Sequence, residues 1–165
     1  MVSCKEILKV VWDRRFRLYY LLPRARSGEI GSLCSLPIRS VMPDRDYRIR
    51  VEILQLYDRK SKKDFKACYR DSQYYRWKCG SYGPKVAERC VRKYLRLLRS
   101  IRKDGYKEPT GVGNHPCMVK VGSEFTRADG AHRLCILRYL KKKNARVVLV
   151  SEDEVRVLYR KYPNV

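Results

Sequence analysis

The sequence predicts an α/β (α+β) protein in which a small mixed sheet is flanked by helices. Two patterns carry this prediction. Amphipathic segments with helical spacing are interspersed with short β-branched segments, and a strand–turn–strand pattern near residue 120 is followed by a helix and a further strand. A chain of 165 residues with 44% hydrophobic residues is long and apolar enough for about one domain.

The first helix is predicted over residues 4–21. Ser3 and Glu6 match a capping box, and apolar residues recur at helical spacing until Pro23 stops the pattern. The many Pro and Gly residues that follow predict an irregular connection over residues 23–46, with at most a short strand near Leu36–Val41.

A strand is predicted next, because Tyr47, Ile49, Val51 and Ile53 alternate with charged residues. The apolar run at Leu54–Leu56 leaves a helix open as the alternative. The chain is then basic and aromatic from Asp58 to Gly83 without a clean period. Its rings could stack nucleic-acid bases, or they could pack a loop-rich lid onto the core, and we favour packing.

A long helix is predicted from Pro84 to Gly105, which can act as its C-cap. Its outer face is strongly basic and is a candidate for binding a polyanion, although a solvated basic face is an equal alternative. The candidate residues are Arg89, Arg92, Lys93, Arg96 and Arg99.

The C-terminal part follows a hairpin–helix–strand order. Met118–Val121 and Phe125–Ala128 flank a Gly-Ser turn, and a helix that can end at Asn144 precedes a β-branched strand at Arg146–Val150. Such an order implies a partly parallel sheet with a right-handed crossover. A capping box formed by Ser151 and Glu154 opens a final helix.

These elements divide the chain into two parts. Residues 1–83 are predicted to be an N-terminal helix with a basic and aromatic extension, packed on the same domain as a core formed by residues 84–165.

Net charge is the strongest compositional signal, since 39 Lys and Arg against 17 Asp and Glu give +22. Such a surface favours a polyanionic partner, including DNA or RNA. The seven cysteines lack metal-ligand spacing and are expected to be reduced, mostly buried thiols. Early charged residues argue against a signal peptide or a membrane span, so we expect an intracellular protein in a reducing compartment.

The segment Asp129-Gly130-Ala131-His132-Arg133 is the candidate functional site. It lies at the start of a predicted helix, where unpaired N–H groups and the helix dipole favour a phosphate. Gly130 would give the phosphate access to the backbone, Arg133 would neutralise it, and His132 would donate a hydrogen bond or shuttle a proton. Asp129 could cap the helix, hold Mg²⁺ or accept a proton. A D-G turn before a helix is also common without any binding role.

Residues 119–134 resemble the strand–turn–strand–helix entry of the ParB/sulfiredoxin superfamily, in which a D-G-x-H-R-L run opens the helix. Residues 94–101 and 103–106 are similar to the helix that precedes this hairpin in stand-alone members, so the resemblance covers roughly residues 84–150. It implies a compact fold that binds the phosphates of a nucleotide at this helix start, usually with a divalent cation. Family activities include CTP hydrolysis on DNA, ATP-dependent repair of peroxiredoxin, serine phosphorylation and nuclease action.

Two departures from the family patterns narrow these activities. The catalytic cysteine of sulfiredoxins corresponds to Ala131 here, so that repair reaction is not expected. Partitioning proteins resemble G-E-R-R at this point, whereas Gly130–Arg133 keeps only the glycine and the last arginine. The pattern is closest to the kinase-like and stand-alone members.

The functional hypothesis is a nucleotide-phosphate-binding protein that uses ATP, ADP or CTP with Mg²⁺, in phosphoryl transfer or nucleotide hydrolysis. Asp129 and His132 would be the catalytic residues, Asp129 would hold the metal, and residues 130–133 would bind phosphate. Two alternatives stay open. The protein could bind nucleic acid or act as a nuclease through its basic surface, or it could be a catalytically inert interaction module.

Overall fold

The fold is built on a mixed sheet of four described strands. The structure is a computed structural model that describes residues 4–13, 16–106 and 115–162. In spatial order the strands are β1 (Ser32–Pro37), β4 (Asn144–Val150), β2 (Cys117–Val121) and β3 (Glu124–Arg127). The central pair β2 and β4 is parallel, whereas β1 and β3 run antiparallel to their neighbours.

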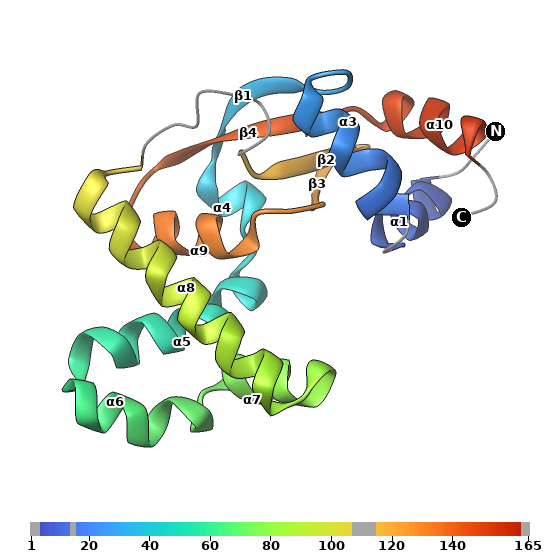
Figure 1. The fold of residues 1–165 in the computed structure, drawn as a ribbon. Coiled ribbons are helices and arrows are strands. Elements are labelled where there is room, and N and C mark those ends of the chain that lie inside the picture. Colours follow the sequence, from blue (N-terminus) through green and yellow to red (C-terminus); the bar gives the residue numbers. More distant parts are fainter. Residues whose placement is uncertain (1–3, 14–15, 107–114, 163–165) are drawn as a thin grey trace.

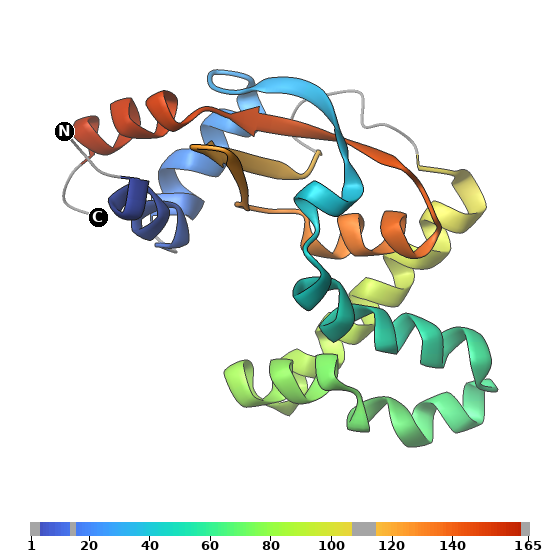
Figure 2. The same ribbon diagram turned by 180° about the vertical axis from the view of Figure 1, so that it is seen from behind.

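Helices cover both faces of this sheet (Figure 1, Figure 2). One face packs against α4 (Ile38–Val41), α5 (Asp44–Arg59), α8 (Pro84–Asp104) and α9 (Ala131–Tyr139). The other face packs against α1 (Cys4–Trp12), the π-helical turn η1 (Arg17–Leu21), α3 (Leu22–Ser27) and α10 (Glu152–Lys161). The protein is therefore a helix–sheet–helix arrangement with a separate apolar core on each face.

Successive side chains of the two central strands point alternately into the two cores. Met118 and Val147 point into the core under α8 and α9, while Val119 and Val148 point into the core under α1 and α10. All four side chains are at most 1% exposed. Both central strands are thus buried on both faces, as expected for a parallel pair.

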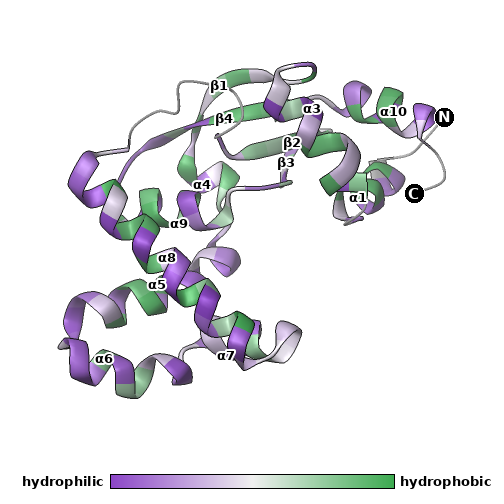
Figure 3. Cartoon of the chain, viewed as in Figure 1, coloured by the Kyte–Doolittle hydropathy of each residue, from purple (hydrophilic) through white to green (hydrophobic). Residues whose placement is uncertain are grey.

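A helical part projects from the sheet below α9 (Figure 1). It consists of α6 (Lys62–Cys68), the 3₁₀ turn η2 (Tyr69–Asp71) and α7 (Gln73–Tyr82), together with α5 and α8. Figure 3 shows hydrophilic segments along α6 and α8. The basic and aromatic segment predicted as a loop-rich lid is therefore mostly helical, and its packing role is confirmed by the burial of Phe65, Tyr74 and Tyr75.

Several sequence predictions are confirmed. The helix that begins at Pro84 ends before Gly105, and the hairpin, the following helix and the strand ending at Val150 lie where the pattern placed them. Asn144 starts β4, however, and α9 already ends at Tyr139. The final helix carries the predicted capping box of Ser151 and Glu154.

The strand predicted over residues 47–53 is wrong and the helix left open as the alternative is correct, because these residues lie within α5. Pro43 precedes the helix, Asp44 and Asp46 fall in its first turn, and the buried residues recur at helical spacing. They are Arg50, Val51, Ile53 and Leu54. The alternating pattern assumed that charged residues face solvent, whereas Arg50 is buried.

The predictions for residues 4–46 are only partly correct. Instead of one helix over residues 4–21, α1 ends at Trp12, and the Asp13 carboxylate accepts a hydrogen bond from the Phe16 N–H at 2.8 Å. Pro23 does not stop a helix, since it lies in the first turn of α3. The short strand lies at 32–37, and residues 38–41 form α4. Ser3 lies outside the described residues.

The described cysteines 34, 68, 79, 90, 117 and 135 are free thiols, and two of them, Cys117 and Cys135, are buried. Within the described ranges, no helix combines the length and the apolar character that a membrane span requires.

Candidate functional site

The predicted site lies in a cleft of about 760 Å³ between α1–η1 and α7. The end of β3 and the start of α9 also line it, and Figure 1 shows α1 at the right of the sheet and α7 at the bottom of the helical part. Charged and polar residues of the lining are Arg17, Arg26, Arg50, Lys78, His115, Arg127, Asp129, His132 and Arg133, and the rest are Trp12, Trp77, Tyr82, Leu97, Ala128, Gly130 and Ala131. Six of these side chains are Lys or Arg, against one carboxylate.

Gly130 is required by the backbone and by a neighbour. Its φ of +89° lies in the left-handed region, and a Cβ there would lie 2.5 Å from the Pro116 Cβ and 2.7 Å from the Pro116 Cα. The space left by the missing side chain is therefore filled by Pro116. Gly130 therefore serves to direct the chain into α9, and access of phosphate oxygens to the N–H groups of residues 131–133 stays a prediction.

Asp129 does not cap α9. The N-cap position is Gly130, and no side chain caps this helix. Instead, the Asp129 carboxylate forms an ion pair with Arg26 of α3 at 2.9 Å, with about half of each side chain exposed. Of the three roles predicted for this carboxylate, metal binding and proton acceptance stay predictions, and either would have to compete with Arg26.

The start of α9 offers main-chain donors to the cleft. The Leu134 N–H donates to the Gly130 carbonyl at 3.0 Å, which leaves the N–H groups of the three preceding residues outside the main-chain bonding of the helix. The Arg133 side chain is partly buried, lines the cleft and has no hydrogen-bond or ion-pair partner among the described residues. These are the features that the sequence predicted for a phosphate site.

His132 is held against the core. Its Nε2 lies 2.7 Å from the Tyr74 hydroxyl oxygen, and its ring centroid lies 4.7 Å from that of Tyr94. Burial lowers the pKa of His132 to about 4, and the positive charges of Arg50 and Lys78 also lower it. The imidazole is therefore neutral at neutral pH. Because Nε2 is already hydrogen-bonded, its geometry favours a positioning role over the predicted proton shuttle.

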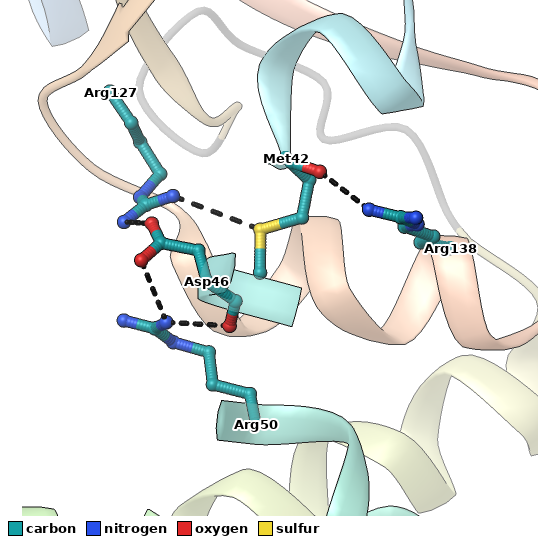
Figure 4. Close-up of polar contacts among 5 residues, drawn as sticks. All are labelled: Met42, Asp46, Arg50, Arg127 and Arg138. Carbon is teal, nitrogen blue, oxygen red and sulfur yellow. Dashed lines mark hydrogen bonds and ion pairs between the residues drawn. The ribbon is translucent and has the colours of Figure 1, made fainter. Parts of the chain in front are cut away.

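A group of residues that the sequence did not single out surrounds this segment. Figure 4 shows Asp46 between two arginines, with the Arg127 guanidinium 2.5 Å from one carboxylate oxygen and Arg50 3.7 Å from the other. Arg50 also donates to the Asp46 carbonyl at 2.9 Å. A single carboxylate is thus the counter-charge for two guanidiniums, and the side chains of Arg50 and Arg127 are only 7% and 12% exposed.

Arg50 retains an unused donor. Only 6% of the residue is exposed, and its Nε has no hydrogen-bond partner among the described atoms. A buried N–H without a partner costs free energy, and because this Nε is itself inaccessible to solvent, a ligand would reach it only if neighbouring side chains moved. The signal that could have identified this residue is the four-residue spacing of Asp46 and Arg50, which makes them neighbours on a helix, whereas in a strand they would lie too far apart to form an ion pair.

Aromatic side chains form part of the wall of the cleft. Trp77 is 41% exposed, and Trp12 and Tyr82 are 59% and 54% exposed. The Arg50 guanidinium lies 5.0 Å from the centroid of the Trp77 ring, and the Lys78 ammonium lies 4.1 Å from it. Burial lowers the pKa of Lys78. The cleft therefore offers both cations and exposed ring surface.

The predicted polyanion-binding residues of α8 lie elsewhere. Arg89, Arg92, Lys93, Arg96 and Arg99 are all exposed and do not line this cleft. Three of them, Arg92, Arg96 and Arg99, line a separate groove. The structure thus brings Asp129–Arg133 together with α5 and α7, and not with the basic face of α8.

Metal binding has limited support in the lining. No group of three or more His, Cys, Asp or Glu side chains suited to a metal ion occurs in the described part of the chain. Mg²⁺ is commonly held by one or two carboxylates together with substrate phosphates. Asp129 fits that pattern only together with a ligand that supplies the other oxygens.

Compared with family models, curated proteins and solved structures, the chain matches none. The resemblance to the ParB/sulfiredoxin superfamily therefore depends on the residues of the motif and stays a prediction.

Proposed function

We propose that the cleft binds a nucleotide, with its phosphates at the start of α9 and its base against the aromatic wall. The observation that carries this proposal is the lining itself. Six cationic side chains line the cleft with one carboxylate, and among them Arg50 lies beside the 41% exposed indole of Trp77. A volume of about 760 Å³ is within the range of ligand pockets.

The phosphates would be held by two kinds of donor. The N–H groups of residues 131–133 offer directed hydrogen bonds at the positive end of α9, and Arg133 offers a planar fork that needs no rearrangement of an existing ion pair. Charge-assisted hydrogen bonds contribute about 1.5–3 kcal/mol each, so these groups would supply most of the affinity.

The base would contact Trp77, with Trp12 and Tyr82 as further rings in the lining. Stacking of a base on an aromatic ring contributes about 1–3 kcal/mol and tolerates any base. The described lining therefore supports recognition of a nucleotide in general and does not select ATP, ADP, CTP or GTP.

The proposed reaction is Mg²⁺-dependent phosphoryl transfer or hydrolysis, as the resemblance to the ParB/sulfiredoxin superfamily implies. Asp129 is the carboxylate available in the described lining to bind the metal or to accept a proton, and Arg26 would have to move from it. His132 would orient the start of α9 through its contact with Tyr74. The bound Mg²⁺ would supply charge neutralisation on the phosphates.

Calorimetric titration with ATP, ADP, CTP and GTP, each with Mg²⁺, tests the proposal. We expect binding, and we expect Arg133→Ala to weaken it about tenfold, equivalent to about 1.4 kcal/mol. The matched control is Arg99→Ala, which removes the same charge outside the cleft. Absence of binding at millimolar nucleotide, or equal weakening by both variants, would refute the proposal.

Inorganic tripolyphosphate, which has no base, distinguishes binding of the phosphates from binding of the base. Trp77→Ala should weaken ATP binding about tenfold because it removes a stacking surface, and it should leave tripolyphosphate binding nearly unchanged. An equal loss for both ligands would place the base away from Trp77.

Nucleic-acid binding is the second candidate, supported by the net charge of +22 and by the five exposed cations of α8. It would give an affinity for DNA or RNA that falls steeply with salt, with a log–log slope near −0.9 for each duplex phosphate contact. Absent or salt-insensitive binding would remove this candidate and the nuclease activity with it.

A further inference from the structure

A second groove lies in the helical part, between α6 and α8. It has a volume of about 590 Å³, and its lining shares no residue with that of the nucleotide cleft. The groove is formed by the end of α5, by α6 and by one stripe of α8, all of which are visible in the lower part of Figure 1.

The floor of the groove is apolar. Phe65, Val91 and Leu95 are 9%, 3% and 7% exposed, and the partly buried rings of Tyr57 and Tyr69 extend the floor. The rings pack on one another: Phe65 stacks on Tyr69 with centroids 5.4 Å apart, and Tyr57 meets Phe65 edge to face at 5.5 Å.

Both edges of the groove are cationic. Arg92, Arg96 and Arg99 repeat at intervals of four and three residues, so they form one stripe of α8 about 10 Å long. The opposite edge carries Lys60, Lys62 and Lys66. All six side chains are exposed, and none has an ion-pair partner among the described residues.

The acidic residue of the lining does not balance this charge. The Glu88 carboxylate is paired with Arg70 at 2.8 Å. An uncharged or basic occupant would leave six cations facing one another across an apolar floor, whereas an acidic occupant would neutralise them.

We propose that this groove binds an acidic amphipathic helix of a protein partner. Apolar side chains at positions i, i+3 or i+4, and i+7 would lie on the floor, and Asp or Glu side chains on either side of that stripe would meet the two cationic edges. A helix repeats its side chains with the same spacing as Arg92, Arg96 and Arg99 on α8.

The floor favours a protein partner over a single-stranded nucleic acid. Bases bind through exposed ring faces, but Phe65 is only 9% exposed and its face is covered by Tyr69. Val91 and Leu95 add aliphatic surface, which leucine-like side chains contact better than bases do.

Fluorescence anisotropy with a labelled peptide of about fourteen residues, or four helical turns, tests this inference. The peptide carries leucine along one face and glutamate on either side. We expect micromolar binding by the full chain, and at least about tenfold weaker binding of a scrambled peptide that has the same composition but no apolar face, since only the floor distinguishes the two.

Charge reversal tests the edges. The double variant Arg92→Glu with Arg96→Glu should weaken binding at least about tenfold, since two attractions become repulsions. The matched control is Arg89→Glu with Lys93→Glu, an equal charge change on the same helix outside the groove lining, for which we expect less than about threefold weakening. These positions are exposed in the folded chain, and circular dichroism verifies the folding of both variants.

Three outcomes would overturn the inference. Equal binding of the scrambled peptide would show that the floor is not used, and equal effects of the two double variants would show attraction by overall charge alone. An oligothymidylate or a phosphatidylserine vesicle could also compete more strongly than the unlabelled patterned peptide. If that competition is lost in Arg92→Glu with Arg96→Glu, the groove would be assigned to nucleic acid or membrane. None of these results depends on nucleotide binding in the cleft.

Discussion

Substitution of Gly130 by alanine tests whether this glycine serves the fold through Pro116. Two costs add at this position. A non-glycine residue in the left-handed region costs about 1–2 kcal/mol. The added methyl group would also lie 2.5 Å from the Pro116 Cβ and 2.7 Å from its Cα, so backbone must shift.

The cost of the contact with Pro116 can be separated from the backbone cost by comparison with a second glycine. Gly122 has a φ of +59°, and a Cβ there would meet no atom within 4 Å, so Gly122→Ala carries the backbone cost alone. Overpacking of a well-packed site typically costs about 1–3 kcal/mol. We therefore expect Gly130→Ala to lower the free energy of unfolding by about 2–5 kcal/mol, and Gly122→Ala to lower it by about 1–2 kcal/mol.

Urea unfolding followed by circular dichroism measures both values under the same conditions. If Gly130→Ala destabilises the protein no more than Gly122→Ala does, the contact with Pro116 is not a packing constraint. The missing side chain could then leave room for a ligand, as the sequence suggested.

Further predictions concern a buried histidine, a shared carboxylate and a helix cap. The pKa of His132 is lowered from 6.5 to about 4, so the unfolded state binds the proton first, and the free energy of unfolding should fall as pH drops through this window, by at most on the order of 3 kcal/mol. His132→Gln should flatten that part of the curve, and an unchanged slope would contradict the assignment. Asp46→Asn should cost about 2–3 kcal/mol in urea unfolding, because two nearly buried guanidiniums lose their counter-charge, and it should tighten tripolyphosphate binding; unchanged stability would contradict it. Ser151→Ala should cost about 1 kcal/mol by removing the cap of α10, and a loss below about 0.3 kcal/mol would count against the capping box.

The C-terminal third was predictable because its signals are local. The Gly-Ser turn, the capping box and the β-branched segment 146–150 of β4 each depend on residues close together in the sequence. The long helix α8 was predictable because its apolar stripe persists over 21 residues. In such segments the tertiary structure and the local pattern agree, and no long-range contact is needed to choose between helix and strand.

The region around α5 was not predictable in the same way. Its apolar residues at 47, 49, 51 and 53 satisfy a strand pattern, while 47, 51 and 54 satisfy a helical one. The choice depends on Arg50, which is buried by its ion pair with Asp46 and by contacts from distant elements. Period alone treats every arginine as solvent-facing, so a buried arginine shifts the apparent pattern toward a strand.

The candidate site was also predictable only in the part that depends on residues adjacent in the sequence. Asp129–Arg133 was found from the sequence because one pentapeptide contains the turn, the helix start and the charged residue. The walls of the cleft come from α1–η1, α5 and α7, which approach the pentapeptide only through the fold. Those contacts also changed the interpretation of two members, since Arg26 pairs with Asp129 and Tyr74 binds His132.

The arrangement around Asp46 connects the stability of the fold to the proposed ligand. One carboxylate faces two nearly buried guanidiniums, so this part of the cleft carries an excess positive charge before any ligand enters. That excess costs free energy in the unliganded protein. A phosphate would supply the missing negative charge, and because it binds the folded state alone, it would raise the free energy of unfolding. Asp46→Asn enlarges that excess, so it should lower the stability of the free protein while strengthening the stabilisation by tripolyphosphate.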